Sequence, residues 1–198
     1  MGKGRCNPDV DARTIVLVEG TSDQQALEAL AVRRGRDLAL EGVSIVPMGG
    51  ASNIRRFLER LGPHGADVRL AGLCDAGEVD DFRRELERAG IGAELGRRMS
   101  RDEMEAHGFF VCDADLEDEL IRALGGDVVE RVIEAQGETG AFRTLQKQAA
   151  QQDRSRAAQL RRFMGTRGGR KIRYARLLVD ALDPAAVPRP LDRLLAYL

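Results

Sequence analysis

The chain has 198 residues, of which 43% are hydrophobic, 32% are charged and none is tryptophan. This size and composition are typical of one globular domain, alone or with a helical appendage. No apolar run approaches the ~20 residues of a membrane span, and no apolar core of a secretory signal follows the polar first residues. Cys6, Cys74 and Cys112 lack the spacing of a zinc site and suit a reducing compartment. We therefore expect a cytoplasmic protein that makes no membrane contact.

The net charge of −1 conceals an uneven distribution. Residues 1–141 contain 28 acidic and 18 basic side chains, whereas residues 142–198 contain 4 acidic and 13 basic ones. The stretch 154–176 has nine Arg or Lys and no acid. Such a segment either meets an anionic partner or folds back on the acidic body, and the sequence leaves both possibilities open.

Short apolar runs rich in β-branched residues predict four strands, at residues 13–19, 43–48, 68–74 and 108–112. Helices are predicted after the first three strands, and Thr21 is the expected N-cap of the first. Alternating strands and helices predict right-handed crossovers and a parallel sheet flanked by helices, which is an α/β fold. The remainder is predicted to be helical, with breaks at residues 137–140, 165–169 and 183–190. The predicted organisation is a flexible tail (1–12), an α/β domain (13–126) and a helical C-terminal region (127–198).

Acidic residues follow three of the four predicted strands. They include Glu19, Asp23, Asp75, Glu78, Asp115 and Glu117. Because ligands bind at the carboxyl ends of parallel strands, these side chains should gather at one edge of the sheet. Oxygen ligands without histidine or thiolate favour Mg²⁺ or Mn²⁺. Two such ions ~3.5–4 Å apart can hold the attacking and leaving oxygens of a phosphodiester.

Most of these acids also have a purely structural interpretation. Asp23 and Glu117 fit the first turn of a helix, and Asp75 and Asp115 fit N-cap positions. Glu19 is the exception, because it ends an apolar strand, where an unpaired buried carboxylate is costly.

The order of the motifs resembles a known family. Residues 16–23 (Val-Leu-Val-Glu-Gly-x-x-Asp) are similar to the opening motif of TOPRIM domains, and Asp75 matches the first aspartate of their Asp-x-Asp pair. Residues 47–53 and 115–120 resemble the glycine-rich turn and the third acidic motif of the OLD (overcoming lysogenization defect) branch. Residues 169–175 resemble the segment with that branch's active-site lysine. The resemblance spans roughly residues 13–198, and the joint pattern is more specific than any one motif.

This resemblance implies a Rossmann-like TOPRIM domain with a four-stranded parallel sheet, acting as an Mg²⁺- or Mn²⁺-dependent DNA endonuclease with two ions. Glu19, Asp75 and Lys171 are the predicted catalytic residues, and the metal ligands would come from the six acids named above. Lys171 is notable because the chain has 28 arginines and only three lysines. The predicted DNA-binding residues are Arg161, Arg162, Arg167, Arg170, Lys171 and Arg173.

The sequence departs from the OLD pattern at two points. Gly77 stands where the second aspartate of Asp-x-Asp belongs, and Glu78 is the candidate substitute. OLD proteins also join an ATPase to the TOPRIM domain, whereas this chain has no phosphate-binding loop motif. We therefore expect a stand-alone unit that works alone or with an ATPase on another chain.

Two alternative functions remain at this stage. Loss of the second aspartate would suit a nucleic-acid-binding module with weak or no catalysis. An acidic pocket with a lysine also occurs in phosphoacceptor receiver domains, although these place the lysine after a fifth strand.

Overall fold

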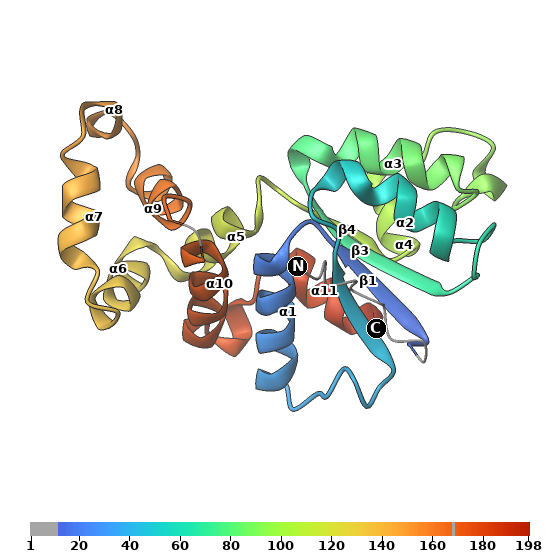
Figure 1. The fold of residues 1–198 in the computed structure, drawn as a ribbon, viewed down its shortest axis with the longest axis horizontal. Coiled ribbons are helices and arrows are strands. Elements are labelled where there is room, and N and C mark those ends of the chain that lie inside the picture. The colour runs from blue at the N-terminus through green and yellow to red at the C-terminus, as the bar shows by residue number, and fades with distance from the viewer. Residues whose placement is uncertain (1–11, 168) are drawn as a thin grey trace, which may run out of the picture.

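The sheet of this protein has four parallel strands. The computed structural model describes residues 12–167 and 169–198, so the predicted tail lies outside the described residues except for Ala12. The strands are β1 (Thr14–Val18), β2 (Val43–Pro47), β3 (Arg69–Asp75) and β4 (Phe109–Cys112). Their order is β2-β1-β3-β4, and every pair is parallel (Figure 1). The predicted α/β class and parallel sheet are confirmed.

Successive side chains of each strand enter different hydrophobic clusters on the two faces of the sheet. In β1, Ile15 and Leu17 join one cluster, whereas Val16 and Val18 join the other. This alternation follows from the two-residue period of a strand. All five residues of β1 are buried, because the strand lies inside the sheet and both of its faces are covered.

Helices cover both faces (Figure 1). One face carries α2 (Ile54–Leu61), α3 (Val79–Arg88) and α4 (Arg101–Ala106). The other face carries α1 (Thr21–Arg33), α10 (Arg170–Ala181) and α11 (Arg189–Tyr197). Short 3-10 helices stand at Ala51–Asn53 (η1), Ala76–Glu78 (η2), Ala93–Leu95 (η3) and Pro184–Ala186 (η4). The short helix α4 has no counterpart among the elements expected from the sequence.

The C-terminal region is helical, as predicted. After β4 the chain forms α5 (Leu116–Leu124), α6 (Gly126–Ala135), α7 (Thr139–Gln146), α8 (Ala149–Gln152) and α9 (Arg156–Met164). Helices α6 to α9 project to one side of the sheet as an arm, and α10 brings the chain back (Figure 1). Within the described part of the chain, no helix combines the length and apolar composition needed to cross a membrane.

Helices α10 and α11 share the core of the α/β body. Tyr174, Leu178 and Leu194 are buried in the same cluster as Val16 of β1 and Leu27 of α1. Arg33 of α1 ties that helix to the end of α10, since its guanidinium donates to the carbonyl oxygens of Val179 and Leu182, the latter at 2.7 Å. The C-terminal region therefore comprises an outer arm and two inner helices, and the domain division at residue 126 stays a prediction.

The packing of α11 can be tested by truncating Leu194, whose side chain is fully buried. Leu194→Ala should lower the free energy of unfolding by ~2–5 kcal/mol, because it removes buried methyl groups and leaves a cavity. Urea unfolding followed by circular dichroism measures this change. Arg193→Ala, at an exposed position of the same helix, should stay within about 0.5 kcal/mol of the wild type. Equal effects of the two substitutions would contradict a core role for α11.

Candidate metal and nucleic-acid site

The candidate site lies at the carboxyl end of the sheet, between β1 and β3. The connection from β1 to β2 runs through α1 on one face, whereas the later connections run through α2, α3 and α4 on the other face (Figure 1). Ligands of open parallel sheets bind where the crossovers diverge in this way. Glu19 follows β1 and Asp75 ends β3, so both stand at this position.

Several acids act on one another here. We call this group the acidic edge, and its members are Glu19, Asp23, Asp75, Asp115 and Glu117. Burial, together with the negative charges of Glu19, Asp23 and Asp115, raises the pKa of Asp75 to about 7. Burial likewise raises the pKa of Asp23 and of Glu117, both of which are almost fully enclosed. Burial therefore disfavours the ionised forms of Asp23, Asp75 and Glu117, and a cation among these carboxylates would relieve the cost.

Lys171 supplies one positive charge at this edge. Its Nζ lies 3.0 Å from Oε2 of Glu117. Partial burial lowers the pKa of Lys171, but the negative charges of Glu117, Asp23 and Asp115 outweigh that effect and leave the pKa raised. The lysine is the second residue of α10, and the packing of α10 on α1 brings it here.

Two of the acids also cap helices. Asp115 is the N-cap of α5, since its Oδ1 accepts a hydrogen bond from the Asp118 N–H at 2.9 Å, and its other oxygen pairs with Arg161. The prediction that Thr21 is the N-cap of α1 is wrong. Gly20 occupies that position, and its N–H donates to Oδ2 of Asp23 at 2.8 Å. The structural interpretation therefore holds for Asp23 and Asp115, and each keeps its place at the acidic edge.

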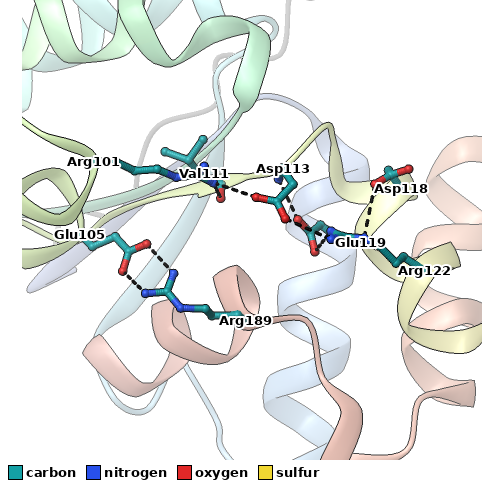
Figure 2. Close-up of polar contacts among 8 residues, drawn as sticks. All are labelled: Arg101, Glu105, Val111, Asp113, Asp118, Glu119, Arg122 and Arg189. Atoms are coloured by element: carbon teal, nitrogen blue, oxygen red, sulfur yellow. Dashed lines mark hydrogen bonds and ion pairs between the residues drawn. The ribbon is translucent and has the colours of Figure 1, made fainter.

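The remaining acids after β4 belong to a separate polar network (Figure 2). Arg122 contacts Asp113 at 3.0 Å, Glu119 at 2.7 Å and Asp118 at 3.6 Å. Glu119 also accepts a hydrogen bond from the Asp113 N–H at 2.8 Å. Arg101 donates to the Val111 carbonyl oxygen at 2.5 Å and lies 3.3 Å from Asp113. These contacts hold the turn between β4 and α5, which carries Asp115 and Glu117.

A second ion pair stands beside this network (Figure 2). Arg189 of α11 binds Glu105 of α4 through two hydrogen bonds of 2.7 and 2.9 Å. It borders a cleft of about 480 Å³ that Arg101 and Arg122 also line. The cleft lies between α4, β4, α5 and α11. All three of these arginines already contact carboxylates, so none of them is left to bind an anionic ligand by itself.

The donor atoms at the acidic edge suit a hard cation. All are carboxylate oxygens, and Oε1 of Glu117 is buried without a hydrogen-bond partner, which is costly unless an ion or water completes it. Across residues 12–167 and 169–198, however, no three His, Cys, Asp or Glu side chains converge closely enough to hold an ion in this arrangement. In this arrangement Asp115 is paired with Arg161 and Glu117 with Lys171.

Comparisons with known proteins agree with this fold. Residues 12–76 match the family model of the overcoming lysogenization defect protein-like TOPRIM domain. The C-terminal region of the Burkholderia pseudomallei OLD protein is 25% identical and superposes with a TM-score of 0.69, over 94% of this chain and 96% of that one. Residues 12–76 therefore match an OLD-like TOPRIM domain, and nearly the whole chain has the fold of an OLD C-terminal region. The C-terminal region of the Xanthomonas campestris pv. campestris OLD protein has the same fold, with 24% identity, a TM-score of 0.71 and 95% coverage of both chains. None of the curated proteins compared with the chain matches it.

The OLD-like TOPRIM domain does not share the layout of a receiver domain. Its described residues contain four strands and no fifth, and Lys171 lies on helix α10. The fold is of the nuclease type, and TOPRIM domains typically use divalent metals.

The basic segment 154–176 is less free than the sequence suggests. The prediction is wrong for Arg170, whose guanidinium is buried 4.0 Å from the ring centre of Phe163 and 2.9 Å from Glu138. Glu138 also pairs with Arg173 at 2.7 Å. Arg161, Arg162 and Arg167 are exposed, although Arg161 contacts Asp115. Ion pairs with acids of the same chain therefore neutralise part of the positive charge of segment 154–176.

Glu78 has less support than the other acids. It is half-buried in η2, and its charge acts on the neighbouring Cys74, whereas the charges that act most on Asp75 come from other residues. Gly77 is exposed, its φ lies outside the left-handed region, and a Cβ there would meet nothing within 4 Å. The backbone at Gly77 can therefore accept a side chain.

Two cysteines lie beside the acidic edge. Cys74 precedes Asp75 and Cys112 ends β4, and both thiols are free and buried. Burial raises the pKa of Cys74 to about 12 and raises that of Cys112 as well. Both thiols therefore stay protonated and unreactive in the folded protein. They face opposite sides of the sheet, since Cys74 and Cys112 belong to different hydrophobic clusters.

Asp75 should make the stability of the metal-free protein depend on pH. Its folded pKa of about 7 lies above the ordinary 3.8. The stability contributed by neutral Asp75 is therefore complete below pH ~4 and is lost as the pH rises through 7. In EDTA at pH 8, Asp75→Asn should raise the Tm by roughly 2–4 °C, the change that ~1 kcal/mol produces in a chain of this size. At pH 5 the gain should be smaller.

Differential scanning fluorimetry at both pH values measures this effect. Asp153→Asn, at an exposed position, is the matched control and should change the Tm equally little at both. A Tm difference for Asp75→Asn that does not grow with pH would contradict the electrostatic strain at the acidic edge.

Proposed function

We propose that this protein is a metal-dependent DNA endonuclease that hydrolyses phosphodiester bonds at the acidic edge. The observation that carries this proposal is the joint presence of Asp23, Asp75, Glu117 and Lys171 at the carboxyl end of the sheet, with mutual electrostatic effects. The OLD-like TOPRIM match supports a nuclease over other uses of the same fold.

In this proposal Glu19, Asp23, Asp75 and Glu117 would hold two Mg²⁺ or Mn²⁺ ions, with Asp115 beside them. When bound, such ions activate a water and stabilise the charge that develops on the phosphate. Glu19 follows β1 and Asp75 ends the neighbouring strand β3, so these two side chains would set the spacing of the centre. The buried Glu117 carboxylate, whose Oε1 has no hydrogen-bond partner among the described residues, would contribute an oxygen that the fold already shields from bulk solvent.

Lys171 would bind the scissile phosphate directly. Its ammonium is half exposed, so one side faces Glu117 and the other is open to substrate. An ammonium is a compact charge that can follow a phosphate oxygen as negative charge grows during reaction. A lysine that releases Glu117 on substrate arrival would free that carboxylate for a cation.

Nicking of supercoiled plasmid with Mg²⁺ or Mn²⁺, and with EDTA as the blank, tests the proposal. Glu19→Gln should lower the nicking rate at least ~100-fold, because the ions supply several kcal/mol of transition-state stabilisation. Glu134→Gln, at an exposed position on α6, should leave the rate unchanged. Lys171→Met should lower the rate by roughly 10–1000-fold with nearly unchanged DNA affinity, and Lys171→Arg should restore part of it. A wild-type protein that nicks no faster than the EDTA blank would refute the proposal.

A second candidate function is nucleic-acid binding without efficient catalysis, and Gly77 favours it. The open space at this position makes a gain of function testable. If the missing carboxylate limits ion binding, Gly77→Asp should make the Mn²⁺-induced rise in Tm larger at a given Mn²⁺ concentration. The same substitution should raise the nicking rate by about tenfold or more. Gly77→Asn supplies the same shape without the charge and should do neither. If Gly77→Asp leaves a slow nicking rate unchanged, the second aspartate is not what limits this chain.

A further inference from the structure

A cleft of about 300 Å³ opens next to the candidate metal site, between the start of α5, helix α9 and the start of α10. The residues that line it include Asp115 and Glu117, together with the small residues Ala158 and Gly165. Four cations line it: Arg154, Arg161, Arg162 and Lys171. The cleft therefore carries an excess of two positive charges beside the acidic edge.

The four cations differ in what they contact. Arg161 pairs with Asp115, and Lys171 pairs with Glu117. Arg154 and Arg162 have no carboxylate within ion-pair distance among residues 12–167 and 169–198, and both are exposed. The charge that no acid neutralises in this cleft thus comes from two guanidinium groups.

Other arginines near the site are already satisfied. Arg156, next to the N-cap of α9, binds both Asp127 and Glu130 at 2.6 Å. Around the cleft of about 480 Å³, Arg101, Arg122 and Arg189 all contact carboxylates (Figure 2). Free guanidinium donors beside Glu117 and Lys171 therefore distinguish the α5–α9–α10 cleft from the rest of this polar surface.

We infer that this cleft binds a backbone phosphate next to the scissile one, held by Arg154 and Arg162. Guanidinium groups match the oxygens of a phosphate through paired hydrogen bonds. The inference rests on the proposed function, because Lys171 and Glu117 mark where the scissile phosphate would lie. It assigns the substrate class: a strand with at least two consecutive phosphodiesters, gripped on the side facing the helical arm.

Two substrates separate this subsite from the catalytic centre. Bis(p-nitrophenyl) phosphate has a single phosphate and occupies only the centre, whereas a fluorescein-labelled 12-nucleotide strand also fills the cleft. The variants are Arg154→Ala/Arg162→Ala and the control Arg143→Ala, which changes an exposed arginine on α7 away from the cleft. Binding is measured by fluorescence anisotropy in Ca²⁺ at several salt concentrations, and hydrolysis of each substrate is measured in Mn²⁺.

The double variant should bind the oligonucleotide roughly 10–100-fold more weakly at low salt, the loss expected for charge-assisted hydrogen bonds to one phosphate. The slope of log affinity against log salt should fall by about 0.7, the share of one phosphate on a single strand. Hydrolysis of bis(p-nitrophenyl) phosphate should change less than about twofold, and Arg143→Ala should change neither measurement.

Each contrary result has a distinct meaning. Oligonucleotide binding that is equal in the double variant and in Arg143→Ala overturns the subsite. A double variant that loses hydrolysis of the small substrate as well also overturns it, because the two arginines would then act at the centre or on the fold. If the wild type hydrolyses neither substrate but binds the strand through Arg154 and Arg162, the subsite stands and the nuclease proposal fails.

Discussion

Burial of several carboxylates at one edge of the sheet is the constraint on which the candidate site depends. The parallel sheet directs Glu19 and Asp75 to one edge, and the helices that follow add Asp23, Asp115 and Glu117. Such a group is unfavourable without positive charge. Cations from the C-terminal region supply that charge: Lys171 forms an ion pair with Glu117, and Arg161 forms one with Asp115.

This requirement gives the C-terminal helices a role in the site as well as in the core. Helix α10 packs along α1 and fills the core with Tyr174 and Leu178. The same helix carries Lys171 on its first turn. The apolar packing therefore fixes the position of the ammonium, and a loss of contact between α1 and α10 would separate the cation from the acids.

Much of this could be read from the sequence, because the decisive signals are local. Apolar runs that end in acids predict both the strands and the edge at which Glu19 and Asp75 meet. Long-range pairing was not readable in the same way. Arg170 looked like a DNA contact because its neighbours are basic, yet Glu138, far away in the chain, neutralises it in a buried pair. Residue spacing also does not reveal that Asp23 accepts a hydrogen bond from the Gly20 N–H. This contact belongs to an N-cap at Gly20, one residue before the predicted cap Thr21.

The acidic run after β4 shows the same limit. Its members fall into two environments. Asp113 and Glu119 are held by Arg122, whereas Asp115 and Glu117 join the candidate site. Composition alone marks the whole run as acidic and cannot sort its members.

The placement of the cysteines has a practical consequence. Cys74 lies beneath the layer of α2, α3 and α4, and Cys112 lies beneath the layer of α1, α10 and α11. Alkylating reagents attack thiolates, so either cysteine reacts only when its own layer lifts from the sheet. The two residues are thus built-in reporters of separate opening events. Their relative labelling rates under native conditions would tell which helical layer leaves the strands first.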